Sequence, residues 1–210
     1  MKTNCYHQVS QKQYFLETKK HPSIAKDVQR FQNWLSSGNE TDFQVYIGDI
    51  GQDTKIAFEA RNLLIVGNVN AVWLDACNPK PYGDGGSLFI TGNVTCDYFN
   101  GYYGKVIIIG GHLTVRAILN NAFQDSSLII NGNLETEFFH GQDIWAEVRE
   151  KITLTYGIGY CLPHSYTDAQ KQSVLPTYDT ATSREYLGIA EETEESPEVQ
   201  VQMLISARNP

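Results

Sequence analysis

The sequence predicts a mainly β protein, a single-stranded parallel β-helix of about four to five coils with an N-terminal helix and an α-helical or irregular C-terminal cap. Two observations carry this prediction. One short sequence motif occurs four times along the chain, and the apolar residues around it alternate with polar ones as they do in strands. The composition agrees, because 41% hydrophobic and 19% charged residues in a chain of 210 are typical of a globular protein.

The repeated motif is centred on a glycine. Its four copies are LLIVGNV, LFITGNV, IIIGGHL and LIINGNL, and their glycines are separated by 25, 19 and 21 residues (Gly67, Gly92, Gly111 and Gly132). A weaker copy, residues 45–50, lies 19 residues before the first. We interpret each copy as one coil, with variable loops such as residues 78–86 absorbing the differences in length. The glycine then marks a bend where a side chain would clash or φ would be unusual.

Aligning the copies gives columns of similar residues that should point into one core. The column two residues before the glycine holds isoleucine throughout (Ile65, Ile90, Ile109 and Ile130). The columns two and seven residues after it are also apolar (Val69, Val94, Leu113 and Leu134; Leu74, Phe99, Ile118 and Phe139). This pattern favours stacked parallel coils. The alternative is an antiparallel sandwich in which Gly-Asn forms hairpin turns, but no second run of matching length pairs with each copy.

The segments that flank the repeats complete the predicted organisation. Residues 1–42 form an N-terminal helical cap, because Pro22 can begin a helix, Ser23 can cap it, and an apolar stripe follows (Ile24, Val28, Phe31 and Leu35). The β-helix covers residues 43–160. Its register is lost after Gln142, with a short helix expected at 143–148 and a further strand at 152–156. Residues 161–210 form an acidic C-terminal segment with a terminal helix that caps the solenoid.

Charge and sorting signals limit the function classes. The net charge of −8 argues against a nucleic-acid partner and suits a basic protein partner. No secretory signal or apolar run long enough for a membrane is present, so we expect a cytoplasmic protein with no membrane partner, acting as a monomer or small homo-oligomer. The four cysteines form no CxxC pair and are expected to be reduced thiols (Cys5, Cys77, Cys96 and Cys161).

The sequence contains no recognisable catalytic, metal or cofactor motif, so it predicts a protein that is not an enzyme and has no cofactor. Some β-helix enzymes use carboxylates on one sheet face, and this chain offers four in the repeats (Asp75, Asp97, Glu135 and Glu137). Asp97 and Glu137 share a column with Arg116 between them, which indicates a ladder of charges. Tyr102 and Tyr103, flanked by glycines, are expected at a contact surface. We predict that these six residues bind a partner.

Over residues 43–140 the Gly-Asn-Val/Leu coils resemble polymer-forming, bactofilin-like bacterial β-helix proteins and stand-alone β-helix immunity proteins of toxin systems. The second resemblance implies a protein that binds and neutralises a cognate toxin, expected to be basic and nuclease-like. The first implies a structural, self-assembling protein, which is the alternative. An N-terminal helix, a long acidic C-terminal part and irregular coil lengths depart from the bactofilin pattern. A carbohydrate-active β-helix enzyme is the third hypothesis for the function.

Overall fold

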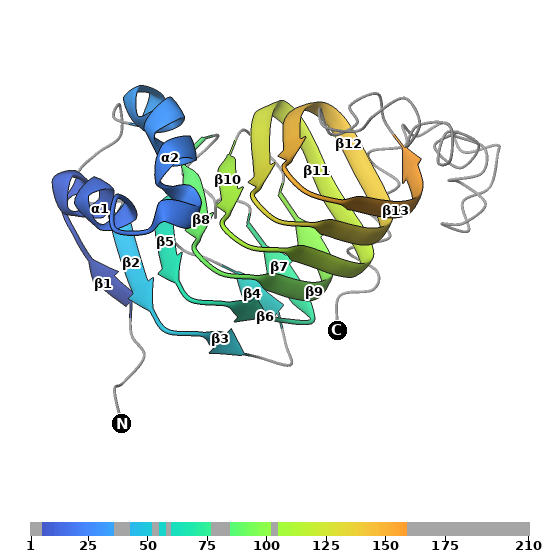
Figure 1. Ribbon diagram of the computed structural model, residues 1–210, viewed down its shortest axis with the longest axis horizontal. Coiled ribbons are helices and arrows are strands. Elements are labelled where there is room, and N and C mark those ends of the chain that lie inside the picture. The colour runs from blue at the N-terminus through green and yellow to red at the C-terminus, as the bar shows by residue number, and fades with distance from the viewer. Residues whose placement is uncertain are drawn as a thin grey trace.

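The computed structural model describes residues 6–35, 43–51, 55–57, 60–76, 85–101 and 105–158. In this part of the chain the strands stack in parallel as a β-solenoid, and two helices lie along one side of it (Figure 1). The predicted parallel β-helix is therefore confirmed. One strand departs from the parallel arrangement: β1 (Tyr6–Gln8) pairs antiparallel with the first strand of the solenoid.

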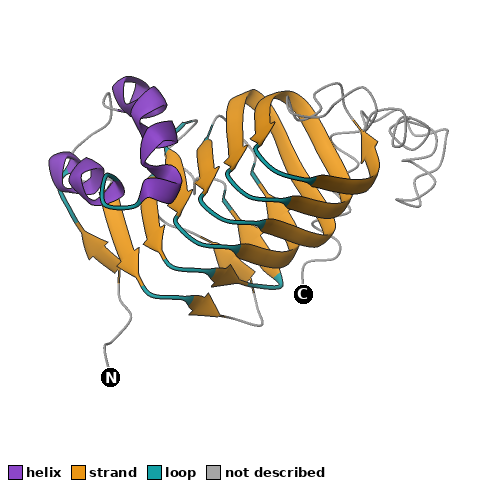
Figure 2. Cartoon of the chain, in the orientation of Figure 1, coloured by secondary structure: helices purple, strands orange, loops and turns teal. Residues whose placement is uncertain are grey.

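Each coil of the solenoid passes along three sheet faces (Figure 2). The first face contains β2 (Phe43–Ile47), β5 (Asn62–Val66), β8 (Ser87–Ile90), β10 (Val106–Ile109) and the last segments of β11 (Leu113–Ile130) and β12 (Leu134–Val148). The second face contains β3 (Ile50–Gly51), β6 (Val69–Asn70) and the first segments of β9 (Val94–Asn100), β11, β12 and β13 (Ile152–Ile158). The third face contains β4 (Lys55–Ala57), β7 (Trp73–Asp75) and later segments of β9, β11, β12 and β13.

The interior of the solenoid is apolar and fully buried. The four isoleucines of the predicted column all belong to it and have no exposed surface (Ile65, Ile90, Ile109 and Ile130). One column prediction is wrong by a residue. Leu119, not Ile118, stacks between Phe99 and Phe139, because β11 has a register shift between Val115 and Ile118 that adds one residue.

The recurring glycines stand at the corner between the first and second faces, where successive coils touch. The backbone N–H groups of Gly92, Gly111 and Gly132 each donate to the carbonyl of the preceding glycine in the stack at 3.0 Å. A Cβ atom on Gly132 would lie 2.8 Å from the Gly111 carbonyl oxygen, and one on Gly67 would lie 2.2 Å from that of Gly48. The clash predicted for a side chain at this bend is thus confirmed, because the coils approach too closely there for any Cβ.

The outer side of the first face is covered by the two helices, α1 (Gln11–Thr18) and α2 (Pro22–Leu35). Outward-facing strand residues such as Leu64, Phe89 and Ile108 pack beneath them in a second hydrophobic core. The buried Tyr14 hydroxyl lies within hydrogen-bond distance of Ser87 Oγ, at 3.0 Å, and Ser87 donates to Asn62 Oδ1 at 3.0 Å. Burial raises the pKa of Tyr14 well above its usual range, and the Ser87 hydrogen bond offsets only part of this effect.

The N-terminal region differs from the sequence prediction in two details. A first helix, α1, precedes the predicted one and begins with a capping box in which Ser10 and Gln13 bond reciprocally. The predicted helix begins at Pro22 as expected. Ser23 lies inside its first turn and donates to the Thr91 carbonyl at 3.0 Å, so it anchors α2 to the solenoid and does not cap it.

Residues 143–148 form strand, not the short helix that was predicted. They complete β12, and residues 144–148 pair in register with residues 126–130 of β11, so the coil register continues beyond Gln142. The side chains explain the difference. Ala146 and Val148 point into the core while Glu147 points outward, which is the alternation of a strand. The predicted acidic segment and terminal helix, residues 161–210, lie outside the described residues.

Candidate partner-binding surface

Two of the predicted partner-binding carboxylates are exposed together on β12, Glu135 within the second face and Glu137 at its edge toward the third face. Glu135 lies in register between Thr114 and Thr153, and Glu137 follows two residues later on β12. Leu134 and Thr136 on either side of Glu135 are buried, so Glu135 points away from the solenoid, and Glu137 is exposed as well. Within the described part of the chain, no ion pair reaches either glutamate.

Asp97 lies at the same edge of the second face, one coil before Arg116, and the two side chains form an ion pair. The predicted charge ladder is thus present at this step. Because Arg116 is 52% exposed and Asp97 is 32% exposed, solvent screens the pair and its contribution to stability is small. The second face therefore presents the carboxylates of Glu135 and Glu137 next to a neutralised pair.

The other predicted site residues do not join this group. Asp75 lies on the third face, where its Oδ1 accepts a hydrogen bond from Asn100 Nδ2 at 3.3 Å. Tyr102 and Tyr103 lie outside the described residues. The structure thus places three of the four carboxylates along the second face and its edge, and Asp75 on the third face.

A ladder of side-chain acceptors runs along the glycine corner, and the sequence reasoning missed it. In each coil, the residue after the glycine accepts a hydrogen bond from the backbone N–H of the equivalent residue one coil further on. The bonds join Asp49 to Asn68 at 2.7 Å, Asn68 to Asn93 at 2.8 Å, Asn93 to His112 at 2.8 Å, His112 to Asn133 at 2.9 Å and Asn133 to Lys151 at 3.0 Å. The signal was present in the repeated Gly-Asn pair. We call this set the corner ladder.

A second ladder lies on the third face and is buried at Asn100, Asn120 and His140. Asn100 Nδ2 donates to Asp75, Asn120 Nδ2 donates to Asn100 Oδ1 at 2.7 Å, and the His140 Nδ1 lies 2.6 Å from Asn120 Oδ1. These residues occupy one register column, and Asn120 and His140 are at most 1% exposed. We call this set the amide ladder. Its hydrogen bonds offset the cost of burying polar groups.

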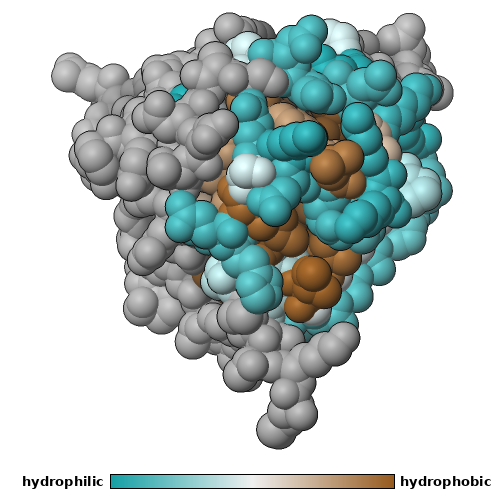
Figure 3. Space-filling view, turned by 90° about the vertical axis from the view of Figure 1, so that its left-hand side faces the viewer, coloured by the Kyte–Doolittle hydropathy of each residue, from teal (hydrophilic) through white to brown (hydrophobic). Residues whose placement is uncertain are grey.

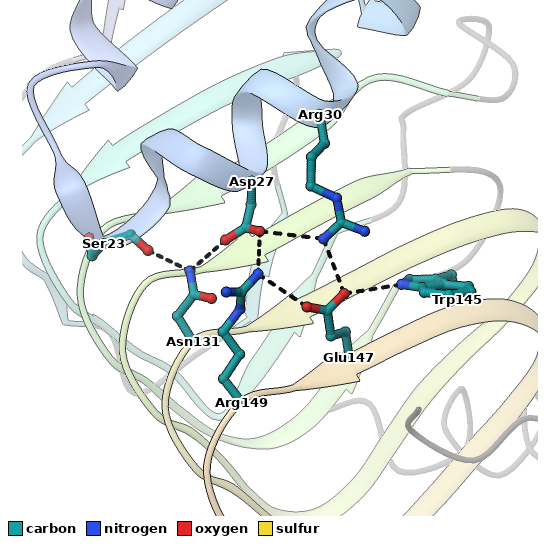
Figure 4. A network of polar contacts seen from close by, with 7 residues as sticks. All are labelled: Ser23, Asp27, Arg30, Asn131, Trp145, Glu147 and Arg149. Atoms are coloured by element: carbon teal, nitrogen blue, oxygen red, sulfur yellow. Dashed lines mark hydrogen bonds and ion pairs between the residues drawn. The ribbon is translucent and has the colours of Figure 1, made fainter. Parts of the chain in front are cut away.

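A network of charged groups fixes α2 to the last coils (Figure 4). The carboxylate of Asp27, which is 2% exposed, accepts from Asn131 at 2.9 Å and from Arg149 at 2.6 Å. Asn131 also donates to the Ser23 carbonyl. Glu147 accepts from Arg30 at 3.1 Å and lies 3.1 Å from Arg149. Two carboxylates and two guanidinium groups balance in charge, so the network is suited to holding the helix in place.

The pKa of Glu147 reflects this setting. Burial is the largest single influence and acts to raise it. Hydrogen bonds from Arg30 and Trp145, with the charges of Arg30 and Arg149, together outweigh burial and hold the pKa below the ordinary value of 4.5. Glu147 is therefore ionised in the folded protein at neutral pH.

A groove of about 500 Å³ lies between α1 and the first strands, at the N-terminal end of the solenoid. Figure 3 views this end and shows apolar surface between polar residues. Leu16 and Ile47 contribute to its lining and are 51% and 57% exposed. Glu17 and Lys20 on the rim are joined by an ion pair of 2.6 Å and so neutralise each other.

The described residues contain no cluster of three or more His, Cys, Asp or Glu side chains that could hold a metal ion. Cys96 is buried in the core, and burial raises the pKa of its thiol well above the usual range. None of the described helices has the length and apolar character needed to cross a bilayer. Comparisons with known protein families, with curated proteins and with solved structures gave no match.

Proposed function

We propose that this protein is a non-enzymatic binding protein that acts by stoichiometric association, and that its partner is a basic protein. The most specific form of the proposal is an immunity protein that neutralises a cognate, nuclease-type toxin. The observation that carries the proposal is the exposed pair Glu135 and Glu137 on the second face. Acidic groups fixed on a regular sheet can face the basic cleft with which a nuclease holds phosphates.

The overall charge supports a basic partner. The chain carries a net charge of −8, and an acidic surface attracts a basic partner during diffusion and raises the association rate. Exposed charges act mainly in this way, because their desolvation in the complex offsets much of the attraction. The proposal therefore predicts fast, salt-sensitive association.

The alternative proposal is a self-assembling structural protein whose solenoids stack end to end. The N-terminal end argues against this. There β1 pairs antiparallel with β2, so the edge of β2 that a parallel coil would extend is already occupied. Sedimentation at increasing protein concentration separates the proposals, because filaments that grow with concentration would favour self-assembly.

The function is tested with the product of the reading frame next to this protein's gene. The two proteins are expressed together and separately, and cell growth and calorimetric titration are measured. We expect the neighbouring product to inhibit growth, and this protein to restore growth by forming a complex of fixed stoichiometry. Restoration by catalytic amounts of this protein, through turnover of a substrate, would contradict the proposal.

The surface is tested separately with charge reversals. Glu135→Lys and Glu137→Lys should slow association and weaken its dependence on salt, with little change in dissociation. Glu17→Lys on α1 is the matched control, because it changes the net charge equally on another part of the molecule. If the control slows association as much as the second-face variants, the long-range net charge and not this face guides the partner.

Two predicted elements outside the described residues need their own variants. Tyr103→Ala should speed dissociation if that ring is an anchor buried in the complex. The glutamate-rich segment from Glu185 to Glu198 is the competing binding site. Replacing its glutamates with glutamine in the full chain should leave binding unchanged. Loss of binding there, with normal binding by the second-face variants, would move the site to that segment.

A further inference from the structure

The outward side of the third face is buried. On β9, β11 and β12, Phe99, Leu119 and Phe139 point into the core, so the residues on either side of each point outward. Yet Ile118 and Phe138 have no exposed surface, and Trp73 in the same register column is 3% exposed. An outward-pointing side chain on a sheet can be this buried only when something lies on the sheet.

The described helices and strands do not supply that cover. Both helices pack on the first face, and neither of the two hydrophobic cores includes Trp73, Ile118 or Phe138. The amide ladder runs beside these residues on the same outward side, and Asn120 and His140 are buried as completely. The cover therefore spans both an apolar column and a polar column across several coils.

The path of the chain identifies the segment that can provide the cover. The last described residue, Ile158, pairs with His140 on the third face, so the chain leaves the solenoid at the end of the amide-ladder column. The 52 residues from 159 to 210 follow it. From β13 to β7 the face has four strand spacings, or about 19 Å, which a segment of this length can cross in any conformation.

We propose that the third face is a docking surface and that its occupant is the protein's own C-terminal segment, residues 159–210. This inference is independent of the proposed toxin binding. The segment has residues suited to the face. Its apolar side chains, spaced four and one residues apart, can pack on the column that holds Ile118 and Phe138 (Val199, Met203 and Leu204). Its many polar side chains can form hydrogen bonds with the amide ladder.

The proposal has a consequence for the partner surface. With the third face occupied, the exposed second face and the N-terminal groove remain open to a partner. An acidic segment seated on the third face would also lie beside the carboxylates of the second face and add to their field.

Photocrosslinking in the full-length protein tests the proposal. In one variant, p-azidophenylalanine replaces Phe138. In a second variant it replaces Tyr98, which is only half-buried and pairs in register with Ile118. The control places it at Thr114 on the second face. After irradiation, mass spectrometry maps the linked peptides. We expect intramolecular links from positions 98 and 138 to residues 159–210, at least fivefold more abundant than from position 114.

Other crosslinking outcomes overturn the proposal. Links from both positions to residues 77–84 or 102–104 would assign the cover to a loop, and links between two molecules would assign it to a second copy. The absence of any link from either position would show that no protein segment lies there. The Tyr98 variant keeps the test valid if the change at the fully buried Phe138 disturbs folding.

A cleavage experiment gives a second readout. A protease recognition site is inserted between Ile158 and Gly159 of the full chain, and the folded protein is cut. We expect the C-terminal fragment to stay bound and to coelute with the solenoid in gel filtration. Adding Ile118→Ala and Phe138→Ala should release it, whereas Ile47→Ala on the exposed N-terminal groove should not. Separation of the fragment from an otherwise unchanged solenoid would refute the docking.

Discussion

The imidazole Nδ1 of His112 accepts the backbone N–H of Asn133 at 2.9 Å. At the equivalent position of other coils, Asn68 and Asn93 make the same bond with an amide oxygen. The histidine therefore occupies an asparagine position in the corner ladder, and only its unprotonated Nδ1 can serve as the acceptor. The tautomer is fixed by this bond, with the proton on Nε2.

Replacing His112 should test the ladder directly. His112→Ala removes the acceptor for Asn133 N–H and should lower the free energy of unfolding by about 1 kcal/mol. His112→Asn restores the acceptor found in the neighbouring coils and should cost less than half of that. Urea denaturation of both variants measures the difference. Equal losses would mean that the ladder bond contributes nothing at this step.

The glycine corner gives a sharper test of coil contact. Gly132→Ala places a Cβ 2.8 Å from the Gly111 carbonyl and 2.4 Å from His112 Nδ1, so the coils must separate. We expect a loss of about 1–3 kcal/mol, the usual cost of overpacking. Gly51→Ala is the control, because a Cβ there meets no atom within 4 Å. Thermal unfolding should show a lowered Tm for the first variant only.

Removing Asp27 should loosen α2. Asp27→Ala deletes the buried acceptor of Asn131 and Arg149, and we expect a loss on the order of 2 kcal/mol, since hydrogen bonds to charged groups are among the stronger ones. Glu17→Ala removes an exposed ion pair with Lys20 and should cost less than about 1 kcal/mol. Chemical denaturation compares the two. A neutral result for Asp27→Ala would show that the apolar contacts alone hold the helix.

Glu147 should make stability depend on pH in the acid range. Its pKa in the folded protein lies below the ordinary 4.5, so the unfolded chain binds its proton first as pH falls. The stabilisation is therefore complete above about pH 5 and is lost as pH falls through the lowered pKa. The Glu147→Gln variant should lack this part of the decrease in the free energy of unfolding at acid pH. Free energies of unfolding measured from pH 3 to 7 check this, and parallel curves for the two proteins would contradict it.

Much of the fold followed from the sequence because the repeat fixes which residues stack. A glycine at one corner and isoleucines two residues before it suffice to align the coils, and their burial agrees with the alignment. The prediction that Ile118 belongs to the core column was wrong, because the extra residue between Val115 and Ile118 changes which side chain points inward. No glycine in the sequence marks that corner. Residues 143–148 are too few for apolar periodicity to separate a helix from a strand, and only the pairing of residues 144–148 with β11 selects the strand.

The candidate surface was predicted less completely. The shared position of Asp97, Arg116 and Glu137 could be counted from the glycines, since no length change intervenes. Asp75 could not be placed in this way, because it follows the corner between the second and third faces. The network around Asp27 could not be predicted from the sequence either, because it joins residues more than 100 positions apart that carry no local pattern.

The attachment of α2 to distant coils bears on how the protein comes apart. A solenoid held only by contacts between neighbouring coils can unravel from its ends one repeat at a time. Here α2 contacts several coils. Its Ser23 donates to the Thr91 carbonyl, and its Asp27 accepts from Asn131 and Arg149 in later coils. These coils cannot separate without releasing the helix. The helix therefore acts as a splint across the stack, so these coils should unfold as one cooperative unit in place of fraying one by one.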